Sequence, residues 1–365
     1  MKAWVKSRPA PGAELTDVPD PVPAPDEVLL KVRRVAICGT DLHIYKWDRW
    51  AQEKIHPPLI FGHEFVGEVV GMGNQVRGHQ LGDLVAVETH VACGHCRLCR
   101  RNLGHVCENM KIVGIDRPGA YAERVAIPAV NAWPVPRGMP LEQAAALEPL
   151  GNAVHSVLAG EIAGCSIAVT GCGPIGLFAI CVARACGAGP ILATDVNDYR
   201  LELARACGAD RTVQVKREDW VEAAREITSG DGLDVVCEMS GQAPVIVESL
   251  RALRNAGRLS LLGLSSQDAT FDFTKLVIFK GITIQGILGR RMFETWHQMT
   301  SLLESGRLDI SKAITHVMPL ADLEEAMSTL AAQQAGKIVL VPWGETANPP
   351  SPRTQSQREP AATRA

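Results

Sequence analysis

The sequence predicts an α/β protein built from two domains: a β-rich first domain and a second domain with an open, doubly wound parallel sheet. The first observation is its length, because 365 residues exceed the roughly 100–200 residues of one ordinary domain. The second is a change of pattern near residue 141, where β-rich sequence punctuated by glycine and proline gives way to short apolar strands that alternate with helices. This alternation is typical of βαβ units and a parallel sheet.

The first domain is expected to be barrel-like, since its apolar segments are short and β-branched and turn residues separate them. Six prolines occur in residues 1–30, and prolines and glycines recur near positions 118, 128, 134 and 138. The strands expected in this part are 27–33, 65–70 and 83–87.

After residue 141 the apolar spacing predicts both helices and strands. The expected helices are 141–160, 174–186, 199–207, 292–305 and 320–332, with a loop between the last two. The expected strands are 167–170, 191–195, 233–238, 258–263 and 337–341. Residues 344–365 are polar and rich in proline, so we expect a disordered tail there.

The composition excludes several classes of protein. Hydrophobic residues make up 46% and charged residues 21%, as in an ordinary soluble protein. A net charge of −3 argues against a nucleic-acid binder, which needs a basic surface. There is no apolar run of the ~20 residues that cross a bilayer, so we expect no membrane partner. The first residues do not form an apolar signal segment, and we therefore expect the cytoplasm.

Eleven cysteines in such a chain indicate metal or thiol chemistry rather than disulfides. Cys93, Cys96, Cys99 and Cys107 follow a C-x2-C-x2-C-x7-C pattern that can surround one tetrahedral zinc, and a zinc with four protein ligands has a structural role. An iron–sulfur cluster is the alternative. His95 and His105 are interpreted as surface residues of the same loop. The cysteines expected to be small buried hydrophobes are Cys165, Cys172, Cys181, Cys186, Cys207 and Cys237.

A glycine-rich turn predicts a dinucleotide site. Gly171, Gly173 and Gly176 follow an expected strand and open an expected helix, where free backbone N–H groups can bind a diphosphate. Asp195 ends the next strand, nineteen residues beyond Gly176. A carboxylate there accepts hydrogen bonds from ribose hydroxyls and repels a 2′-phosphate, which favours NAD over NADP. Arg200 is the opposing signal, because an arginine can attract that phosphate.

Three separated segments suggest a second metal. They contain Cys38, the pair His63 and Glu64, and Glu148. One thiolate, one imidazole and one carboxylate, with water in the fourth position, are typical of a catalytic zinc site. Cobalt or iron would also accept these ligands.

In this order, these segments resemble the zinc-dependent medium-chain alcohol dehydrogenase family over roughly residues 1–343. Gly62-His63-Glu64, with Gly67, is similar to the family's zinc motif G-H-E-x-x-G. The resemblance implies a GroES-like catalytic domain over residues 1–147 with the zinc lobe at 93–107, a Rossmann domain over 148–290, and a return to the catalytic domain over 291–343. It also implies a homotetramer with two zinc ions in each subunit.

The resemblance further implies roles for individual residues. The catalytic zinc would be bound by Cys38, His63 and Glu64, with Glu148 as an exchanging ligand or a proton-relay acid. The NAD contacts would include, besides the glycines of the turn, Ile175, Asp195, Arg200, Leu262, Gly263, Leu264, Gly286 and Ile287.

Five stretches resemble those family members that oxidise L-threonine at its 3-hydroxyl: residues 36–45, 151–155, 194–205, 279–281 and 291–296. We therefore expect L-threonine as substrate and L-2-amino-3-oxobutyrate as product. Thr40 is expected to accept the hydroxyl proton and His43 to pass it to solvent; the alternative is that both only cap a turn. His90 is a candidate for substrate selection.

Three alternatives stand beside this interpretation. A polyol or 2,3-butanediol dehydrogenase would share the scaffold, because one scaffold supports many alcohols. A non-catalytic NAD-binding protein would have lost metal ligands that this chain retains. A zinc-finger-like nucleic-acid binder would explain the four cysteines but not the acidic balance.

Overall fold

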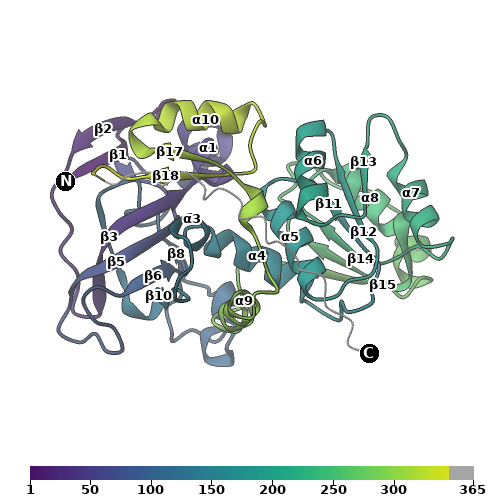
Figure 1. Cartoon of the computed structure of the whole chain (residues 1–365), viewed down its shortest axis with the longest axis horizontal. Helices are drawn as coiled ribbons and strands as arrows, with labels where there is room; N and C mark the ends of the chain where they lie inside the picture. Colours follow the sequence, from purple (N-terminus) through teal and green to yellow (C-terminus); the bar gives the residue numbers. More distant parts are fainter. Residues whose placement is uncertain (345–365) are drawn as a thin grey trace, which may run out of the picture.

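The computed structural model of the chain describes residues 1–344, so nearly all of the tail predicted at 344–365 lies outside the described residues. Two parts lie side by side in Figure 1, with α4 (Leu147–Val157) between them. The part on the left of the figure contains the N-terminus and the part on the right contains a parallel sheet.

The second part is an open sheet of six parallel strands in the order β13-β12-β11-β14-β15-β16. Numbered within this part, the order is 3-2-1-4-5-6, the doubly wound arrangement of dinucleotide-binding domains. The strands are β11 (Ile167–Thr170), β12 (Ile191–Asp195), β13 (Arg211–Gln214), β14 (Leu233–Glu238), β15 (Leu253–Leu261) and β16 (Thr283–Gly286). The α/β prediction is therefore confirmed.

Helices cover both faces of this sheet because successive strand residues point to opposite sides. Ile167 and Val169 pack with α5 (Pro174–Ala185) and α6 (Asp198–Cys207), whereas Ala168 between them packs with α7 (Trp220–Ile227) and α8 (Ala243–Ala252). β11 and β12 are buried along their whole length, which explains why both read as continuous apolar runs in the sequence.

The first part contains a seven-stranded sheet in the order β10-β6-β5-β3-β18-β17, with β9 beside β3. A three-stranded sheet, β2-β1-β4, and a pair, β7-β8, complete it. The strands are β1 (Lys2–Lys6), β2 (Glu14–Asp17), β3 (Glu27–Ala36), β4 (Leu59–Ile60), β5 (Glu64–Met72), β6 (Leu84–Val87), β7 (His90–Val91), β8 (Lys111–Ile112), β9 (Arg124–Pro128) and β10 (Ala132–Pro134).

The last elements of the described chain belong to the first part. They are β17 (Ile314–Pro319), α10 (Leu323–Ala331) and β18 (Lys337–Val341), drawn at the yellow end of the colour scale in Figure 1. β18 lies against β3, and α10 lies against α1 (Gly39–Lys46). The prediction of a loop between residues 305 and 320 was wrong, because β17 lies in this segment. The residues of β17 are mostly half-buried and include Thr315 and His316, so the strand shows no clear apolar pattern and exists because it pairs with β18.

The predicted helix 141–160 is two helices, α3 (Leu141–Ala144) and α4. The remaining helices are α1 (Gly39–Lys46), α2 (Arg49–Lys54), α9 (Glu294–Glu304) and the short turns η1 (Cys99–Arg101), η2 (Gly104–Val106), η3 (Ala129–Asn131), η4 (Thr274–Ile278), η5 (Ser311–Ala313) and η6 (Leu320–Asp322). In residues 1–344 no helix is long and apolar enough to span a bilayer. The exact domain boundaries stay predictions.

All eleven cysteines are free thiols. Four of the six that were expected to be small buried hydrophobes are buried, but Cys165 and Cys186 are only half-buried. Cys165 precedes β11 and Cys186 ends α5, where the chain is already close to the surface.

Candidate active site

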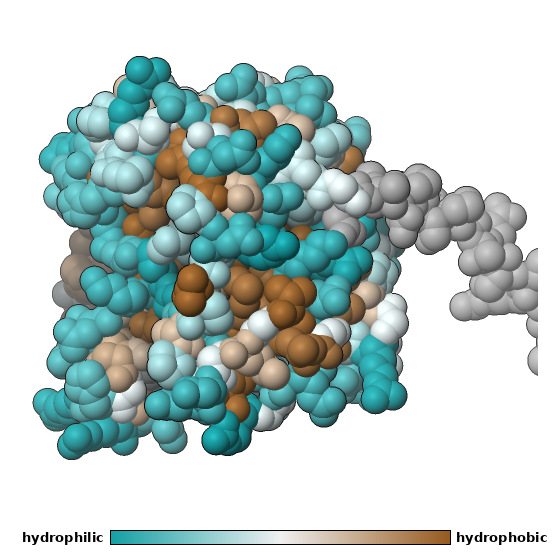
Figure 2. All heavy atoms as spheres, turned by 90° about the vertical axis from the view of Figure 1, so that its left-hand side faces the viewer, coloured by the Kyte–Doolittle hydropathy of each residue, from teal (hydrophilic) through white to brown (hydrophobic). Residues whose placement is uncertain are grey.

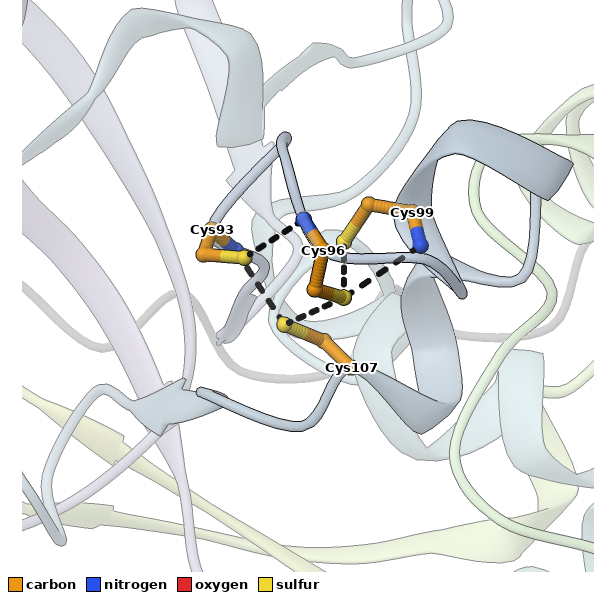
Figure 3. A group of neighbouring side chains, drawn as sticks. All are labelled: Cys93, Cys96, Cys99 and Cys107. Atoms are coloured by element: carbon orange, nitrogen blue, oxygen red, sulfur yellow. Dashed lines mark hydrogen bonds between the residues drawn. The ribbon is translucent and has the colours of Figure 1, made fainter.

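The four cysteines of the predicted structural site lie on a lobe that projects between β7 and β8. Their sulfur atoms are within 4.8 Å of one another, and Figure 3 shows all four turned toward one centre. Cys96 Sγ lies 3.5 Å from Cys99 Sγ and 3.9 Å from Cys107 Sγ. Zinc–sulfur bonds of ~2.3 Å in a tetrahedron separate the sulfurs by ~3.8 Å, so the residues fit a zinc ion.

Backbone N–H groups point at these sulfurs, which favours the thiolate form that binds metal. The N–H of Cys96 donates to Cys93 Sγ at 3.4 Å, and the N–H of Asn109 donates to Cys107 Sγ at 3.3 Å. The backbone N–H groups of His95 and Cys96 lower the pKa of Cys93 to about 6. The ring of His95 is exposed and hydrogen-bonds to Cys93 O instead of entering the cluster. This is the structural zinc site.

A second cluster brings together Cys38, His63 and Glu64, whose ligand atoms also lie within 4.8 Å of one another. Sheet pairing explains the meeting, because Ala36 at the end of β3 pairs with Glu64 at the start of β5. Cys38 follows β3 directly and is the N-cap residue of α1. Cys38 and Glu64, which are far apart in the sequence, therefore lie on the two sides of the candidate metal position.

The surroundings of His63 favour a positive charge. Its Nδ1 is buried without a hydrogen-bond partner and lies 3.5 Å from Asp41 Oδ1, which has none either. Burial alone would lower the pKa of His63, but Asp41 and Cys38 raise it well above its usual range. Asp41 thus faces one ring nitrogen of His63, as acceptors beside metal-binding histidines do. Cys38, His63 and Glu64 supply one thiolate, one imidazole and one carboxylate within 4.8 Å of one another, so this donor set fits a catalytic zinc ion.

Asp41 is a residue that sequence analysis missed. One carboxylate oxygen accepts hydrogen bonds from Cys38 N and Tyr121 Oη, both at 2.9 Å. The side chain is fully buried and therefore fixes the turn that carries the thiolate. Asp41 is the third residue of α1 and completes a capping box with the N-cap residue Cys38.

Glu64 and Glu148 are each paired with a buried cation, which sequence analysis also missed. Lys337 Nζ lies 2.6 Å from Glu64 Oε2, and Arg290 is paired with Glu148 Oε1. Burial raises the pKa of Glu64, Lys337 opposes this effect, and the charge of Glu148 adds to it. A lysine in the otherwise apolar segment Lys337-Ile-Val-Leu-Val was the one available signal, because a buried lysine requires a partner.

Glu148 lies in the first turn of α4 and is buried. It is close enough to affect Glu64 electrostatically, but it is not part of the cluster formed by Cys38, His63 and Glu64. Thr89 donates to Glu148 Oε1 at 3.1 Å. Its predicted role as exchanging ligand or relay acid stays a prediction.

Thr40 and His43 lie one turn apart on α1, so their side chains share a face. Thr40 Oγ1 is 3.7 Å from Cys38 Sγ, whereas His43 is exposed and hydrogen-bonded to Asp48. The helix thus connects the metal cluster with solvent. The relay itself stays a prediction.

His90 lies near the charges of Arg290, Glu88 and Glu148. The Nδ1 atom of its ring is buried and has no hydrogen-bond partner. Burial and the nearby charge of Arg290 lower the pKa of His90 to about 4, so the ring is neutral near pH 7. A Cβ on Gly289 would lie 2.7 Å from the ring, so the two segments touch. Substrate selection by His90 stays a prediction.

The predicted dinucleotide turn lies between β11 and α5. Gly171 has φ +90°, and a Cβ on Gly176 would lie 2.0 Å from Gly171 O. A Cβ on Gly173 would touch nothing, so the fold itself does not require glycine there. The space at Gly173 is what a closely bound diphosphate needs.

Asp195 ends β12 and is buried. Its carboxylate accepts hydrogen bonds from Cys172 N at 2.8 Å and Asn197 N at 2.9 Å. It therefore ties the glycine turn to the start of α6. The nearby Arg200 has a buried Nε without a partner.

The other predicted NAD contacts lie at the carboxyl ends of β11, β15 and β16, the edge at which such sheets bind ligands. Gly263 packs against Gly241, whose N atom would lie 2.2 Å from an added Cβ. Leu264 is exposed and Ile287 is buried. The remaining members are Ile175, Leu262 and Gly286. The turn and this edge fit NAD, although the individual contacts stay predictions.

Comparisons with known proteins agree with this geometry. Residues 24–137 match the alcohol dehydrogenase GroES-like domain, and residues 174–305 match the zinc-binding dehydrogenase family. An L-threonine 3-dehydrogenase from Bacillus licheniformis is 47% identical over 94% of this chain and 99% of its own length. One from Pyrococcus horikoshii is 48% identical, covering 93% and 98% of the two chains.

A solved structure, that of 2R,3R-butanediol dehydrogenase from Bacillus subtilis, superposes with a TM-score of 0.83 at 30% identity and covers 93% of this chain and 99% of that one. Family models and relatives thus span both parts of the structure and both metal clusters. The chain belongs to the zinc-dependent medium-chain alcohol dehydrogenase family.

Proposed function

We propose that the protein oxidises the 3-hydroxyl of L-threonine with NAD, forming L-2-amino-3-oxobutyrate. The observation that carries this proposal is the cluster of Cys38, His63 and Glu64 in a chain that is 47–48% identical to L-threonine 3-dehydrogenases over almost its whole length. The stretches 151–155 and 291–296, which resemble that subgroup, contact Arg290 and its partner Glu88. Arg290 in turn pairs with Glu148, whose charge affects Glu64.

Zinc bound at this cluster would supply a Lewis acid for the substrate hydroxyl, and NAD would supply the hydride acceptor. Cys38, His63 and Glu64 would hold this zinc ion. The Thr40 hydroxyl accepts the substrate's hydroxyl proton while it gives its own proton to the next member of the relay. His43 ends the relay by releasing a proton to solvent, because an imidazole exchanges protons near neutral pH. The carboxylate of Asp195 favours NAD by repelling a 2′-phosphate.

Replacing His43 with alanine is expected to lower kcat about 10-fold or more, since general acid–base groups contribute roughly 10²–10⁴-fold and solvent can replace part of the effect. Binding of NAD, measured by titration, should persist. His79, which lies between β5 and β6 and bonds to Ala129 O, provides the control, and its replacement by alanine should leave kcat unchanged. Equal kcat values for the His43 variant and the wild type would remove His43 from the relay.

The substrate is tested by measuring NADH formation with L-threonine, sorbitol and 2,3-butanediol, each with and without a chelator. We expect kcat/KM for L-threonine to be the highest of the three and the chelator to abolish it. A higher kcat/KM for sorbitol or 2,3-butanediol would support the rival polyol or butanediol activity, and activity that resists metal removal would contradict zinc chemistry.

A homotetramer in the cytoplasm completes the proposal. β16 is an edge strand that pairs with β15 alone among the described strands, and apolar side chains next to it are exposed, including Phe273, Phe279 and Leu288. Figure 2 shows further apolar patches on the face of the first part turned away from the parallel sheet. Two separate apolar surfaces fit an assembly with two kinds of interface, and eleven free thiols fit a reducing compartment.

A further inference from the structure

Residues of the stretch 151–155 on α4 contact the buried side chain of Arg290 and the residue before it. Asn152 Oδ1 accepts a hydrogen bond from Arg290 Nη1 at 3.1 Å. Gly151 leaves room for the same side chain, because a Cβ there would lie 2.5 Å from Arg290 Cγ. His155 hydrogen-bonds to the carbonyl of Gly289, the residue before the arginine, at 2.8 Å. The contacts of Gly151, Asn152 and His155 are thus with Arg290 and its neighbour Gly289, and not with a metal ligand.

The stretch 291–296 contacts Glu88, the other partner of Arg290. The carboxylate of Glu88 is fully buried and receives Arg290 Nε at 2.8 Å and, on its other oxygen, Arg290 Nη2. Trp296 Nε1 donates to Glu88 Oε2 at 2.7 Å. Burial would raise the pKa of Glu88, but Arg290 lowers it below its usual range, so the pair stays ionised.

The remaining Nη1 group of Arg290 reaches Glu148, so the guanidinium lies between two buried carboxylates. Both donors to Glu148, Arg290 and Thr89, bind the same oxygen, Oε1. The planar fork of a guanidinium, once bound at two points by Glu88, fixes the position of its third contact. The carboxylate of Glu148 is therefore held near the metal cluster but outside it.

We propose that Glu88 and Arg290 are positioning residues that hold Glu148 out of the catalytic metal's ligand set, so that Glu64 is the carboxylate ligand until that hold is released. The inference rests on the metal site of the proposed reaction and not on the identity of the alcohol. Displacing the guanidinium frees Glu148 to enter the ligand set and adds a negative ligand, which slows the loss of the metal.

Two variants test this inference. Gly151→Ala pushes against Arg290 while leaving every charge in place, and alanine is favoured over glycine inside a helix. Arg290→Lys keeps the charge and loses the fork. In both, we expect the visible absorption spectrum of enzyme with cobalt at the catalytic site to change. Zinc release to a chelator should slow about 10-fold, within the range by which groups around metal ligands alter affinity.

A double variant and a matched control make the outcome decisive. Adding Glu148→Gln to Gly151→Ala should restore the wild-type spectrum, because no carboxylate is left to enter the ligand set. Arg258→Lys alters a half-buried arginine beside α4, one that donates to Ser156 O at 3.1 Å and to Val157 O at 3.0 Å, and it should leave the spectrum unchanged. NAD titration confirms that each variant is folded.

Unchanged spectra in both Gly151→Ala and Arg290→Lys would overturn the inference, as would faster zinc release, which indicates a merely structural role. A spectral change that survives Glu148→Gln would overturn it as well. All spectra are recorded without L-threonine, so an enzyme that oxidises a different alcohol would refute the proposed substrate and still test the role of Arg290.

Discussion

Replacing Cys38 with alanine is expected to lower kcat/KM for L-threonine at least about 1000-fold. The thiolate is one of three protein ligands in the cluster, so its loss is expected to remove the metal. A Lewis acid stabilises the transition state by several kcal/mol, and ~4 kcal/mol correspond to a change in rate of about 10³-fold. Metal analysis should show one zinc ion per subunit in place of two, because the four-cysteine lobe does not depend on Cys38.

The control for this experiment is Cys186→Ala, which removes another half-buried thiol from the end of α5. It should retain both zinc ions and the wild-type kcat/KM. NAD binding should persist in both variants, since the glycine turn lies on the other domain. A Cys38 variant that keeps two zinc ions and ordinary turnover would show that the cluster is not the catalytic centre.

Replacing Lys337 with methionine is expected to destabilise the zinc-free protein by about 3–5 kcal/mol. Lys337 and Glu64 form a fully buried pair, and Lys337 also donates to Ile37 O at 3.0 Å. Removing one partner leaves a buried carboxylate without compensation, which costs far more than the pair contributes when intact. Urea unfolding of the metal-free enzyme measures the loss.

Lys6→Met offers the matched comparison. Lys6 is equally buried, but its ammonium group contacts the carbonyl groups of Ala10, Gly12 and Tyr45, and burial lowers the pKa of Lys6 to about 8. Its loss leaves unpaired carbonyls and no unpaired charge, so we expect a smaller cost of about 1–3 kcal/mol. Equal losses in the two variants would contradict the electrostatic explanation for Lys337.

The elements that the sequence predicted well are those with strong local patterns. β11, β12 and α5 were found almost to the residue because buried parallel strands are continuous apolar runs and a proline in the first turn marks the start of the helix. β17 was missed because its residues are half-buried. The predicted helix 141–160 breaks at residues 145–146, where the alanines give no signal of a break.

The sequence by itself determined the chemistry of the four-cysteine lobe and the glycine turn, because both depend on local residue types and their spacing. The ligands Cys38, His63 and Glu64 lie in separated segments, and only the resemblance to the family pointed to them as one set. Only the tertiary structure showed which buried cation pairs with each buried carboxylate near the metal site. Lys337 meets Glu64, and Arg290 meets Glu88 and Glu148, across separations of 142 to 273 residues. Ion pairs of this kind leave no local pattern, because burial creates the need for them and only strand and helix packing selects the partner.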